Sequence, residues 1–364
     1  MRILFALPGL HRVQRGAEIA FLAVASELAR AGETVTLIGS GPSLESRPYR
    51  YIEAGAVPRE RFERFPQFPM LRNETAWEEA TFVPGLLRAY RPRDFDLTVT
   101  CSFPFTSLSL RRPVMGGTRP AHIFVTQNGD WPAVARNSEY RLFSCDGLVC
   151  INPDYEARNK DRYRTALIPN GTDLEKFRPG EAERQRFGMS PDRPTVLMVS
   201  AHIASKNVAD GVRAVSQLQG VDLVVAGDGP LRDEINSLAD EIMPGRYRQI
   251  MVPSGEMPAL YRSVDAFLHL SRDESFGNVY VEALATGLPI VAYDLARTRW
   301  ILGDEAYYAG NEQGDVAARL TEALSSAPGV DSRIKRAQRY AWPAIAKKYQ
   351  AFFTEVLKGK LENA

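Results

Sequence analysis

Short apolar runs alternate along the chain with segments whose apolar residues recur at helical spacing. The first half holds such runs at residues 2–8, 34–40, 96–102, 122–127, 147–152 and 166–170. The second half holds them at residues 195–201, 221–227, 249–254, 266–271 and 289–294. Helical patterns fit residues 17–32, 207–219, 231–242, 256–263 and 278–286. Because continuous Val, Ile and Leu runs separated by helices are typical of parallel sheets covered on both faces, the pattern predicts two doubly wound α/β domains.

The boundary between the two predicted domains falls in a polar segment, residues 171–194, that is rich in Gly and Pro. We place it after residue 178, which gives an N-terminal domain of residues 1–178 and a C-terminal domain of residues 179–341. An amphipathic helix at residues 342–359 follows. Two doubly wound domains that face each other leave a cleft, and ligands of such sheets bind beyond the carboxyl ends of the strands. We therefore expect the functional residues in the loops directly after the strands.

Composition narrows the class of protein. The chain has 364 residues and a formal net charge of +1, a balance that gives no reason to expect nucleic-acid binding. Its three cysteines form no CxxC pair, which argues against a disulfide framework or a zinc site and suits a reducing cytosol. The apolar start of the chain is too short for a signal peptide, and no run approaches the ~18 apolar residues of a membrane span. We expect a cytoplasmic protein that contacts a membrane at most peripherally.

Two polar motifs follow strands of the first half. Gly16 opens the first helix, where a small residue lets backbone N–H groups approach a ligand at the helix start. A plain loop with a helix-opening glycine explains it equally well. Asn128 and Asp130 follow the run at residues 122–127, where polar side chains point into the expected cleft. They favour contact with a polar substrate, and the alternative is an ordinary Asn-Gly-Asp turn.

Two more motifs follow strands of the second half. Lys206 begins a helix after the run at residues 195–201, where its ammonium group can pair with a phosphate. The alternative is a lysine that only meets solvent. Gly229 lies in the turn Gly-Asp-Gly-Pro, residues 227–230, which lets a planar group or another backbone come close. The glycines of this turn could also be purely structural.

The histidines of two strand patterns receive no functional role. His122 and His269 lie within apolar runs. A histidine that is hydrogen-bonded in the core or at a sheet edge is the common case at such positions.

Two glutamates stand out in the segment SRDESFGNVYVEALATGLP, residues 271–289. A buried strand ends here, a loop carries Glu274, and a helix that starts near Gly277 and Asn278 carries Glu282. A diphosphate resting on the N–H groups of this helix start would gain from the helix dipole. Because ionised carboxylates only accept hydrogen bonds, the two acids match the diols on either side of the diphosphate of a nucleotide-sugar. A solvated loop acid and an exposed helical acid are the alternatives.

Several motifs together resemble the retaining glycosyltransferases of family 4. The Glu-x7-Glu spacing within ESFGNVYVEALATGLPIVA is similar to that of the family, and so are IPNGTDLEKFRP, LVVAGDGPLRDE and the final AWPAIAKKYQAFF. The resemblance covers the second half of the chain well and the first half loosely. It implies the GT-B fold, in which two Rossmann-like domains face a cleft. It also implies that the C-terminal helix, residues 342–364, packs back towards the N-terminal domain.

The resemblance further implies transfer of a hexose-type sugar from a nucleotide-sugar to a saccharide or lipid-linked acceptor, with retained anomeric configuration. The family uses neither a metal nor another cofactor. Glu282 would bind the ribose diol, Glu274 the hydroxyls of the donor sugar, and Lys206 the diphosphate. Gly16 would lie near the donor phosphate or the acceptor, and Asn128 and Asp130 would take part in catalysis. The turn that offers backbone N–H groups to the diphosphate comprises Ser275, Phe276, Gly277, Asn278 and Val279.

Three positions depart from the pattern of the family. Ala201, followed by His202, stands where the family has an arginine that pairs with the diphosphate, and Asn128 stands where it has a histidine. After the last predicted strand the family often has a Gly-Gly loop that ends in Glu, whereas this chain has Arg297 and Arg299. We hypothesise that one of these two arginines replaces the missing charge. His202 is the other candidate, although a packed strand-end histidine explains it as well.

The sequence leaves the donor, the acceptor and the oligomeric state open. UDP is the commonest base in the family, and GDP, as in GDP-mannose, is the next candidate. The irregular residues 47–77, rich in arginine and aromatic residues, hold the acceptor, contact a membrane that carries a lipid-linked one, or form a solvated insertion. Two alternative functions also remain: another GT-B nucleotide-sugar enzyme, such as an epimerase or a hydrolase, and a non-catalytic nucleotide-sugar binder.

Overall fold

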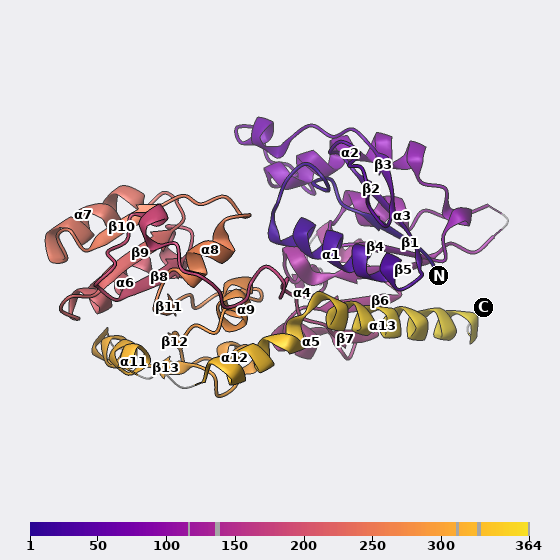
Figure 1. Ribbon diagram of the computed structural model, residues 1–364. Coiled ribbons are helices and arrows are strands. Elements are labelled where there is room, and N and C mark those ends of the chain that lie inside the picture. Colours follow the sequence, from indigo (N-terminus) through magenta and orange to yellow (C-terminus); the bar gives the residue numbers. More distant parts are fainter. Residues whose placement is uncertain (116, 135–138, 311–312, 326–328, 363–364) are drawn as a thin grey trace. The chain divides into compact units, whose positions relative to one another are not determined.

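The computed structural model describes residues 1–115, 117–134, 139–310, 313–325 and 329–362. The chain divides into two compact units (Figure 1). Unit 1 comprises Met1–Asn170 together with Trp342–Ala364, and unit 2 comprises Gly171–Ala341. Each unit is built around one parallel β-sheet, as the alternating apolar pattern predicts.

Unit 1 contains a sheet of seven parallel strands in the order β3-β2-β1-β4-β5-β6-β7. The strands are β1 (Arg2–Ala6), β2 (Thr34–Gly39), β3 (Arg50–Glu53), β4 (Leu97–Thr100), β5 (Ala121–Val125), β6 (Gly147–Cys150) and β7 (Thr165–Leu167). The helices are α1 (Gly16–Arg30), α2 (Glu74–Ala89), α3 (Phe105–Leu110), α4 (Trp131–Val134), α5 (Pro153–Asn159) and α13 (Trp342–Glu362).

Alternate residues of β1 show why the sheet of unit 1 is covered on both faces. Leu4 packs in one cluster with Phe82 of α2. Phe5, the next residue along the strand, contacts Phe21 of α1 instead, with ring centroids 5.4 Å apart. Because successive side chains of a strand point to opposite faces, α1 and α2 cover opposite sides of the sheet.

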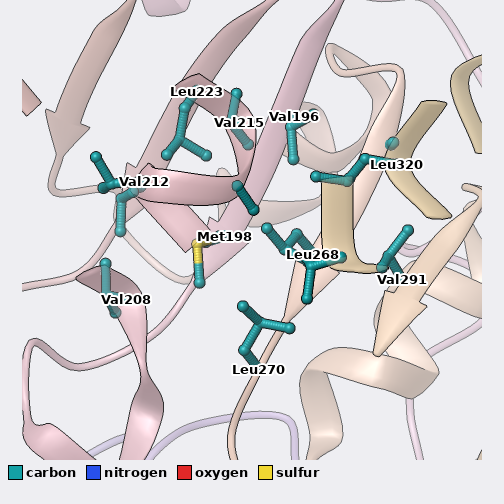
Figure 2. Packing of buried hydrophobic residues seen from close by; sticks show 14 of the residues in the cluster. Val196, Met198, Val208, Val212, Val215, Leu223, Leu268, Leu270, Val291 and Leu320 are labelled. Carbon is teal, nitrogen blue, oxygen red and sulfur yellow. The ribbon is translucent and has the colours of Figure 1, made fainter. Parts of the chain in front are cut away.

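Unit 2 contains a sheet of six parallel strands in the order β10-β9-β8-β11-β12-β13. The strands are β8 (Thr195–Val199), β9 (Asp222–Ala226), β10 (Tyr247–Ile250), β11 (Ala266–His269), β12 (Ile290–Tyr293) and β13 (Tyr307–Ala309). The helices are α6 (Val208–Ser216), α7 (Arg232–Ile242), α8 (Met257–Arg262), α9 (Asn278–Ala285), α10 (Ala296–Leu302), α11 (Gln313–Ser325) and α12 (Val330–Ala337). Figure 2 shows the buried core that joins β8 and β11 to α6 and α11, through residues such as Met198, Val212, Leu268 and Leu320.

Both sheets reverse their strand order once, and this fixes where ligands can bind. In unit 1 the reversal lies between β1 and β4, and in unit 2 it lies between β8 and β11. At such a switch point the connections leave the sheet in opposite directions, so a crevice opens beyond the carboxyl ends of the two strands. The loops after β1, β4, β8 and β11 are therefore the places to look for a site.

The division between the units lies at residue 170, not at residue 178 as the composition of the linker suggested. Residues 171–178 contact unit 2: the Thr172 N–H donates to the carbonyl of Tyr340 at 2.8 Å, and the ring of Phe177 packs against Tyr261. Local polarity does not reveal such contacts. The expected cleft concerns the placement of the two units and stays a prediction.

The sequence pattern missed several short elements. The region expected to be irregular, residues 47–77, holds β3, the 3-10 turn η1 (Arg59–Phe62) and the start of α2. The expected loop after β12 is the helix α10, and the expected strand at residues 249–254 lies earlier, at β10. These elements are short and exposed on one side, so their apolar periodicity is weak.

Candidate functional site

The switch point of unit 2 brings together two residues that lie far apart in the sequence. The 3-10 turn η7 (Ala204–Lys206), after β8, places Lys206 there, and the loop after β11 places Glu274. The Lys206 ammonium group donates to the Glu274 carboxylate, and both side chains are largely buried. The ion pair thus lies beyond the carboxyl ends of β8 and β11, where a ligand is expected.

His269, to which we assigned no functional role from the sequence, completes this arrangement. His269 is the last residue of β11. Its Nε2 lies 2.8 Å from the Glu274 carboxylate, and its Nδ1 lies 3.3 Å from the Ser200 hydroxyl. Because an ionised carboxylate only accepts, Nε2 carries the proton. Burial alone would raise the pKa of Glu274, but the hydrogen bonds from His269 and Lys206 outweigh it and lower that pKa to about 2. Glu274 is therefore ionised at neutral pH.

The other strand histidine has the structural role that its position suggested. His122 of β5 is fully buried. Its two ring nitrogens lie 2.9 Å from the Thr98 hydroxyl and 3.0 Å from the Ser107 hydroxyl. His269 is the last residue of its strand and Glu274 follows five residues later, whereas His122 lies near the start of its strand, and this is the signal that distinguishes the two histidines.

The turn between Glu274 and α9 takes its shape from a glycine. Gly277 has a φ of 89°, and a Cβ there would lie 2.8 Å from the ring of Tyr280, so only glycine fits. Gly277 is the N-cap of α9, which begins at Asn278, and a glycine has no side chain with which to cap the helix. The N-terminal end of a helix favours an anion. The ring of Phe276 is buried against Trp300 and Tyr340, so this residue anchors the turn.

Glu282 has surroundings very different from those of Glu274. It lies just over one turn into α9, and its carboxylate accepts a hydrogen bond of 2.8 Å from the Tyr261 hydroxyl of α8. Burial raises the pKa of Glu282 to about 7, although the Tyr261 bond opposes the shift. The two acids of the motif are therefore tuned in opposite directions.

His202 and Gly229 are packed against each other through their backbones. The His202 N–H donates to the carbonyl of Asp228 at 3.0 Å, and the Leu231 N–H donates to the carbonyl of His202 at 3.0 Å. A Cβ at Gly229 would lie 2.7 Å from the His202 carbonyl oxygen, so the glycine allows this close approach. Burial lowers the pKa of His202. The arrangement favours the structural interpretation of both residues, because a buried neutral imidazole supplies no charge.

Arg297 and Arg299 lie on different faces of α10. The guanidinium group of Arg299 bonds the Asp294 carboxylate at 2.7 Å and lies 4.3 Å from the centre of the Tyr308 ring. Arg297 is three residues before Trp300, so the two share a face of the helix, and Trp300 contacts Phe276 of the anion-binding turn. Of the two arginines, Arg297 is therefore the one that shares a helix face with the residue that contacts the turn.

In unit 1, Gly16 follows β1, one of the two strands at the switch point, and Asn128 follows β5, the strand next to β4. Gly16 is the first residue of α1, and the preceding Arg15 makes no capping bond with its side chain. Asn128 ends the 3-10 turn η3 (Thr126–Asn128) after β5 and is exposed. Its amide donates to Cys101, next to the end of β4, at 3.5 Å. Both residues are thus at the carboxyl edge of the sheet, as expected.

Asp130 is engaged within unit 1. Its carboxylate accepts hydrogen bonds of 2.7 Å from both Arg158 and Asn159 at the end of α5. These contacts hold the loop after β5 against α5. They favour a structural role for Asp130 over the catalytic one that its position suggested.

Three glutamates of unit 1 are buried although no motif of the sequence points to them. Glu18 of α1 and both Glu78 and Glu79 of α2 are almost fully buried. Glu78 is neutralised by Arg12 and by Arg15, whereas burial raises the pKa of Glu18 and raises that of Glu79 to about 8. In the sequence, the burial of these acids is indicated only by their positions: Glu18 lies in the first turn of α1, and Glu78 and Glu79 lie on the core side of α2.

Comparison with known proteins matches both halves of the chain. The family model "Glycosyltransferase Family 4" matches residues 14–176, and "Glycosyl transferases group 1" matches residues 180–340. An alpha-monoglucosyldiacylglycerol synthase of Streptococcus pneumoniae is 27% identical over 59% of this chain and 53% of its own length. A D-inositol 3-phosphate glycosyltransferase of Mycolicibacterium smegmatis is 27% identical over 90% of this chain and 83% of its own length. The first of these matches therefore spans only about half of the relative.

Solved structures resemble the whole chain. Sucrose-phosphate synthase from Thermosynechococcus elongatus aligns with a TM-score of 0.78 at 19% identity, over 98% of this chain and 99% of the other. Anabaena HepE in complex with UDP aligns with a TM-score of 0.70 at 16% identity, over 98% of this chain and all of the other. At these identities the likeness shows the fold, two doubly wound domains, and nothing of the ligand.

Proposed function

Because the chain belongs to glycosyltransferase family 4 and has its GT-B fold, we propose that it transfers a hexose-type sugar from a nucleotide-sugar to a saccharide or lipid-linked acceptor. The product would be a polysaccharide or a glycolipid. The observation that carries the proposal is the cluster of Lys206, Glu274 and His269 at the switch point of unit 2, close in sequence to the start of α9 after Gly277.

The donor diphosphate would rest on the N–H groups at the start of α9, with Lys206 as its counter-ion. Lys206 would then exchange Glu274 for a phosphate oxygen. The freed Glu274 oxygen would accept hydrogen bonds from hydroxyls of the donor sugar, while His269 keeps the carboxylate in place. Glu282 would bind the ribose diol, oriented by Tyr261.

The chemical step would rest on electrostatic stabilisation of the leaving diphosphate. Lys206, the dipole of α9 and Arg297 supply positive potential that is fixed before the reaction begins. We propose retention of the anomeric configuration, with the leaving phosphate taking the acceptor proton, and a reaction that needs neither a metal nor another cofactor. These features follow from the resemblance to the family. Gly16 and the exposed amide of Asn128 would meet the acceptor on unit 1.

For the donor we favour a UDP-sugar and place GDP-mannose next. UDP is the commonest base in the family, and the similar Anabaena protein binds UDP. The names of the two relatives mention a diacylglycerol glucoside and an inositol phosphate, which supports an acceptor with hydroxyl groups on a lipid or a small polyol. We propose a cytoplasmic location, in keeping with three free cysteines, and peripheral contact with the inner face of the membrane.

The test is nucleotide release from a panel of UDP-, GDP-, ADP- and TDP-sugars, with and without pools of saccharide and lipid-linked acceptors. We expect release only when both substrates are present. The variants Lys206→Ala and Glu274→Gln should each lower kcat/KM by about tenfold or more, because a hydrogen bond to a charged group contributes roughly 1.5–3 kcal/mol.

Other outcomes would reassign the protein. Release or isomerisation without any acceptor would make it a hydrolase or an epimerase. Stabilisation by a nucleotide-sugar in thermal unfolding, with no turnover under any acceptor, would make it a binding protein. Asp130→Asn serves as a control for the loop after β5, since its partners are structural and its loss should act through stability.

A further inference from the structure

A small cavity lies at the end of the unit 2 sheet where the strands begin, and we call it the amino-edge cavity. It has a volume of about 60 Å³ and lies over the starts of three neighbouring strands, β8, β9 and β10. Lys206 follows β8 at the opposite end, and the five residues of β8 span about 16 Å at a rise of ~3.3 Å each. The cavity is therefore separate from the site described above. The residues that line it include Gly188, Ser190, Arg193, Asp222, Arg246 and Arg248.

The charged side chains that line the cavity are three arginines and one aspartate. The guanidinium group of Arg193 lies 3.1 Å from the Asp222 carboxylate, so the charges of this pair offset each other. Arg246 donates to two backbone carbonyls at 2.7 Å and 2.8 Å, which are neutral and leave its charge uncompensated. Arg248 is exposed, and no ion pair joins it to an acid in the part of the chain that the structure describes. The cavity therefore has an excess of positive charge and favours an anion.

The wall of the cavity is held in place by contacts that need no ligand. Arg184, behind the wall, donates to the carbonyls of Ser190 and Arg193 at 3.0 Å and 2.6 Å. Gly188 has a φ of 66°, and a Cβ there would lie 3.0 Å from the Cζ of Arg248. The glycine thus lets this guanidinium group lie against the backbone of the linker. Because the wall is shaped in advance, an anion would lose little binding free energy to ordering it.

Asp222 adds a second requirement for a ligand. This residue is only 9% exposed, and its Oδ2 faces Arg193. Its Oδ1 is buried and has no hydrogen-bond partner among the described residues. Buried polar atoms are normally hydrogen-bonded, so an unsatisfied oxygen that lines a cavity points to a donor on a ligand. A carboxylate oxygen only accepts, and the ligand should therefore carry a hydroxyl or an N–H group near its anionic group.

We propose that the amino-edge cavity is a second ligand site of unit 2 and that it binds the phosphate group of a phosphorylated polyol. The phosphate would lie among Arg193, Arg246 and Arg248, and a neighbouring hydroxyl would donate to Asp222. A phosphate monoester offers three acceptor oxygens to the three guanidinium groups, whereas a carboxylate offers two.

The size of the cavity agrees with a ligand that enters it by one end. One water needs about 10–15 Å³ of such space. A volume of about 60 Å³ therefore admits a group of several heavy atoms such as a phosphate, and the rest of the ligand would lie outside. The proposal does not rest on the proposed function, because no nucleotide-sugar takes part in it.

The experiment is calorimetric titration of the full chain, in a chloride buffer, with inorganic phosphate, glycerol phosphate and glycerol. The wild type should bind glycerol phosphate about threefold or more tightly than inorganic phosphate, since a hydroxyl gains a charged acceptor, and should not bind glycerol. Arg193→Gln and Arg248→Gln should each weaken the binding of both phosphates by about fivefold to tenfold. Asp222→Asn should bind inorganic phosphate more tightly, because the lining loses its negative charge, and should prefer glycerol phosphate less.

Two control variants separate this site from other sites. Arg213→Gln removes an arginine of α6 that, like Arg193, pairs with an aspartate, and the two side chains are 41% and 43% exposed. Lys206→Ala removes the cation of the proposed donor site. Both variants should bind glycerol phosphate at the amino-edge cavity as the wild type does, and thermal unfolding checks that every variant is folded. Amide hydrogen exchange should slow at residues 188–195 and 245–248 when glycerol phosphate is bound, and not at residues 272–280.

The proposal is overturned if the wild type binds neither phosphate, or if Arg248→Gln binds them as Arg213→Gln does. It is also overturned if Lys206→Ala abolishes binding and the protection appears at residues 272–280, because the phosphate then occupies the proposed donor site. Failure of the proposed function is seen separately, in the nucleotide-release assay. A protein that transfers sugar but does not bind glycerol phosphate contradicts only the proposal made here for the cavity.

Discussion

At the scale of single residues, the two glutamates of one motif illustrate how surroundings decide chemistry. Glu274 receives hydrogen bonds from Lys206 and His269, which bring its pKa to about 2 in spite of burial. Glu282 is partly buried and receives only the neutral hydroxyl of Tyr261, so burial raises its pKa to about 7. Glu274 is thus a permanent anion, whereas the charge of Glu282 depends on pH near neutrality.

This difference predicts a pH dependence of donor binding. An ionised Glu282 offers acceptors to both hydroxyls of a diol, and protonation removes one of them. The pKa of about 7 means that the charged form dominates above pH 7 and is lost as the pH falls through it. The Kd of the nucleotide-sugar, measured by calorimetry, should therefore weaken severalfold from pH 8 to pH 6. Both phosphates of this ligand are esterified, so its own charge stays constant.

Two variants separate Glu282 from other groups that titrate near neutral pH. Glu282→Gln should bind more weakly and should flatten the profile. Tyr261→Phe removes the hydrogen bond that lowers the pKa of Glu282, so its profile should shift to higher pH. A profile that keeps its shape in both variants would assign the titration to another group.

The residue scale also shows what sequence reasoning can and cannot find. Lys206 and Glu274 were predicted from their positions after strands and from the motif of the family, and the structure pairs them. His269 and the partners of Asp130 were not, because their significance depends on contacts between segments that are not adjacent in the chain. Glu274 lies five residues from His269, but only the bend after β11 turns the two side chains toward each other.

At the scale of elements, α10 favours one of two hypotheses that the sequence left equal. As a loop, residues 295–300 gave no reason to prefer Arg297 or Arg299. As a helix, they separate the two side chains by about 200° around the axis. Arg299 is bound to Asp294 and lies over Tyr308, whereas Arg297 shares a face with Trp300, which packs on the anion-binding turn. The helix was missed because its seven residues are too few to show a period.

The expected outcome is a difference between two otherwise equal substitutions. Arg297→Ala should raise the donor KM or lower kcat by about tenfold or more, since a charged hydrogen bond to the diphosphate is lost. Arg299→Ala should leave both constants within about twofold, because an exposed ion pair contributes little. Steady-state kinetics of sugar transfer by the two variants checks this. A larger loss in Arg299→Ala than in Arg297→Ala would contradict the assignment.

At the scale of the whole molecule, the two series of strands predicted the two sheets, because buried parallel strands are continuous apolar runs such as TVLMV in β8. The end of unit 1 was harder to find. It depends on residues 171–178 contacting unit 2 and on α13 returning to unit 1, and both are long-range contacts. Only the resemblance to a family, and no periodicity, suggested where α13 would pack.

The return of α13 predicts that a change near the C-terminus weakens the N-terminal sheet. The helix α13 belongs to unit 1 (Figure 1), where it contacts α1 and β5. Phe353 of this helix is fully buried. Phe353→Ala should destabilise unit 1 by roughly 3–5 kcal/mol, the range for removing a buried aromatic ring, and Glu355→Ala on the exposed face should not. Amide hydrogen exchange should show faster opening of α1 and β5 in the first variant, with the strands of unit 2 still protected. Equal loss of protection in β8 would mean that the two units unfold together, and unchanged protection in α1 would mean that α13 does not stabilise unit 1.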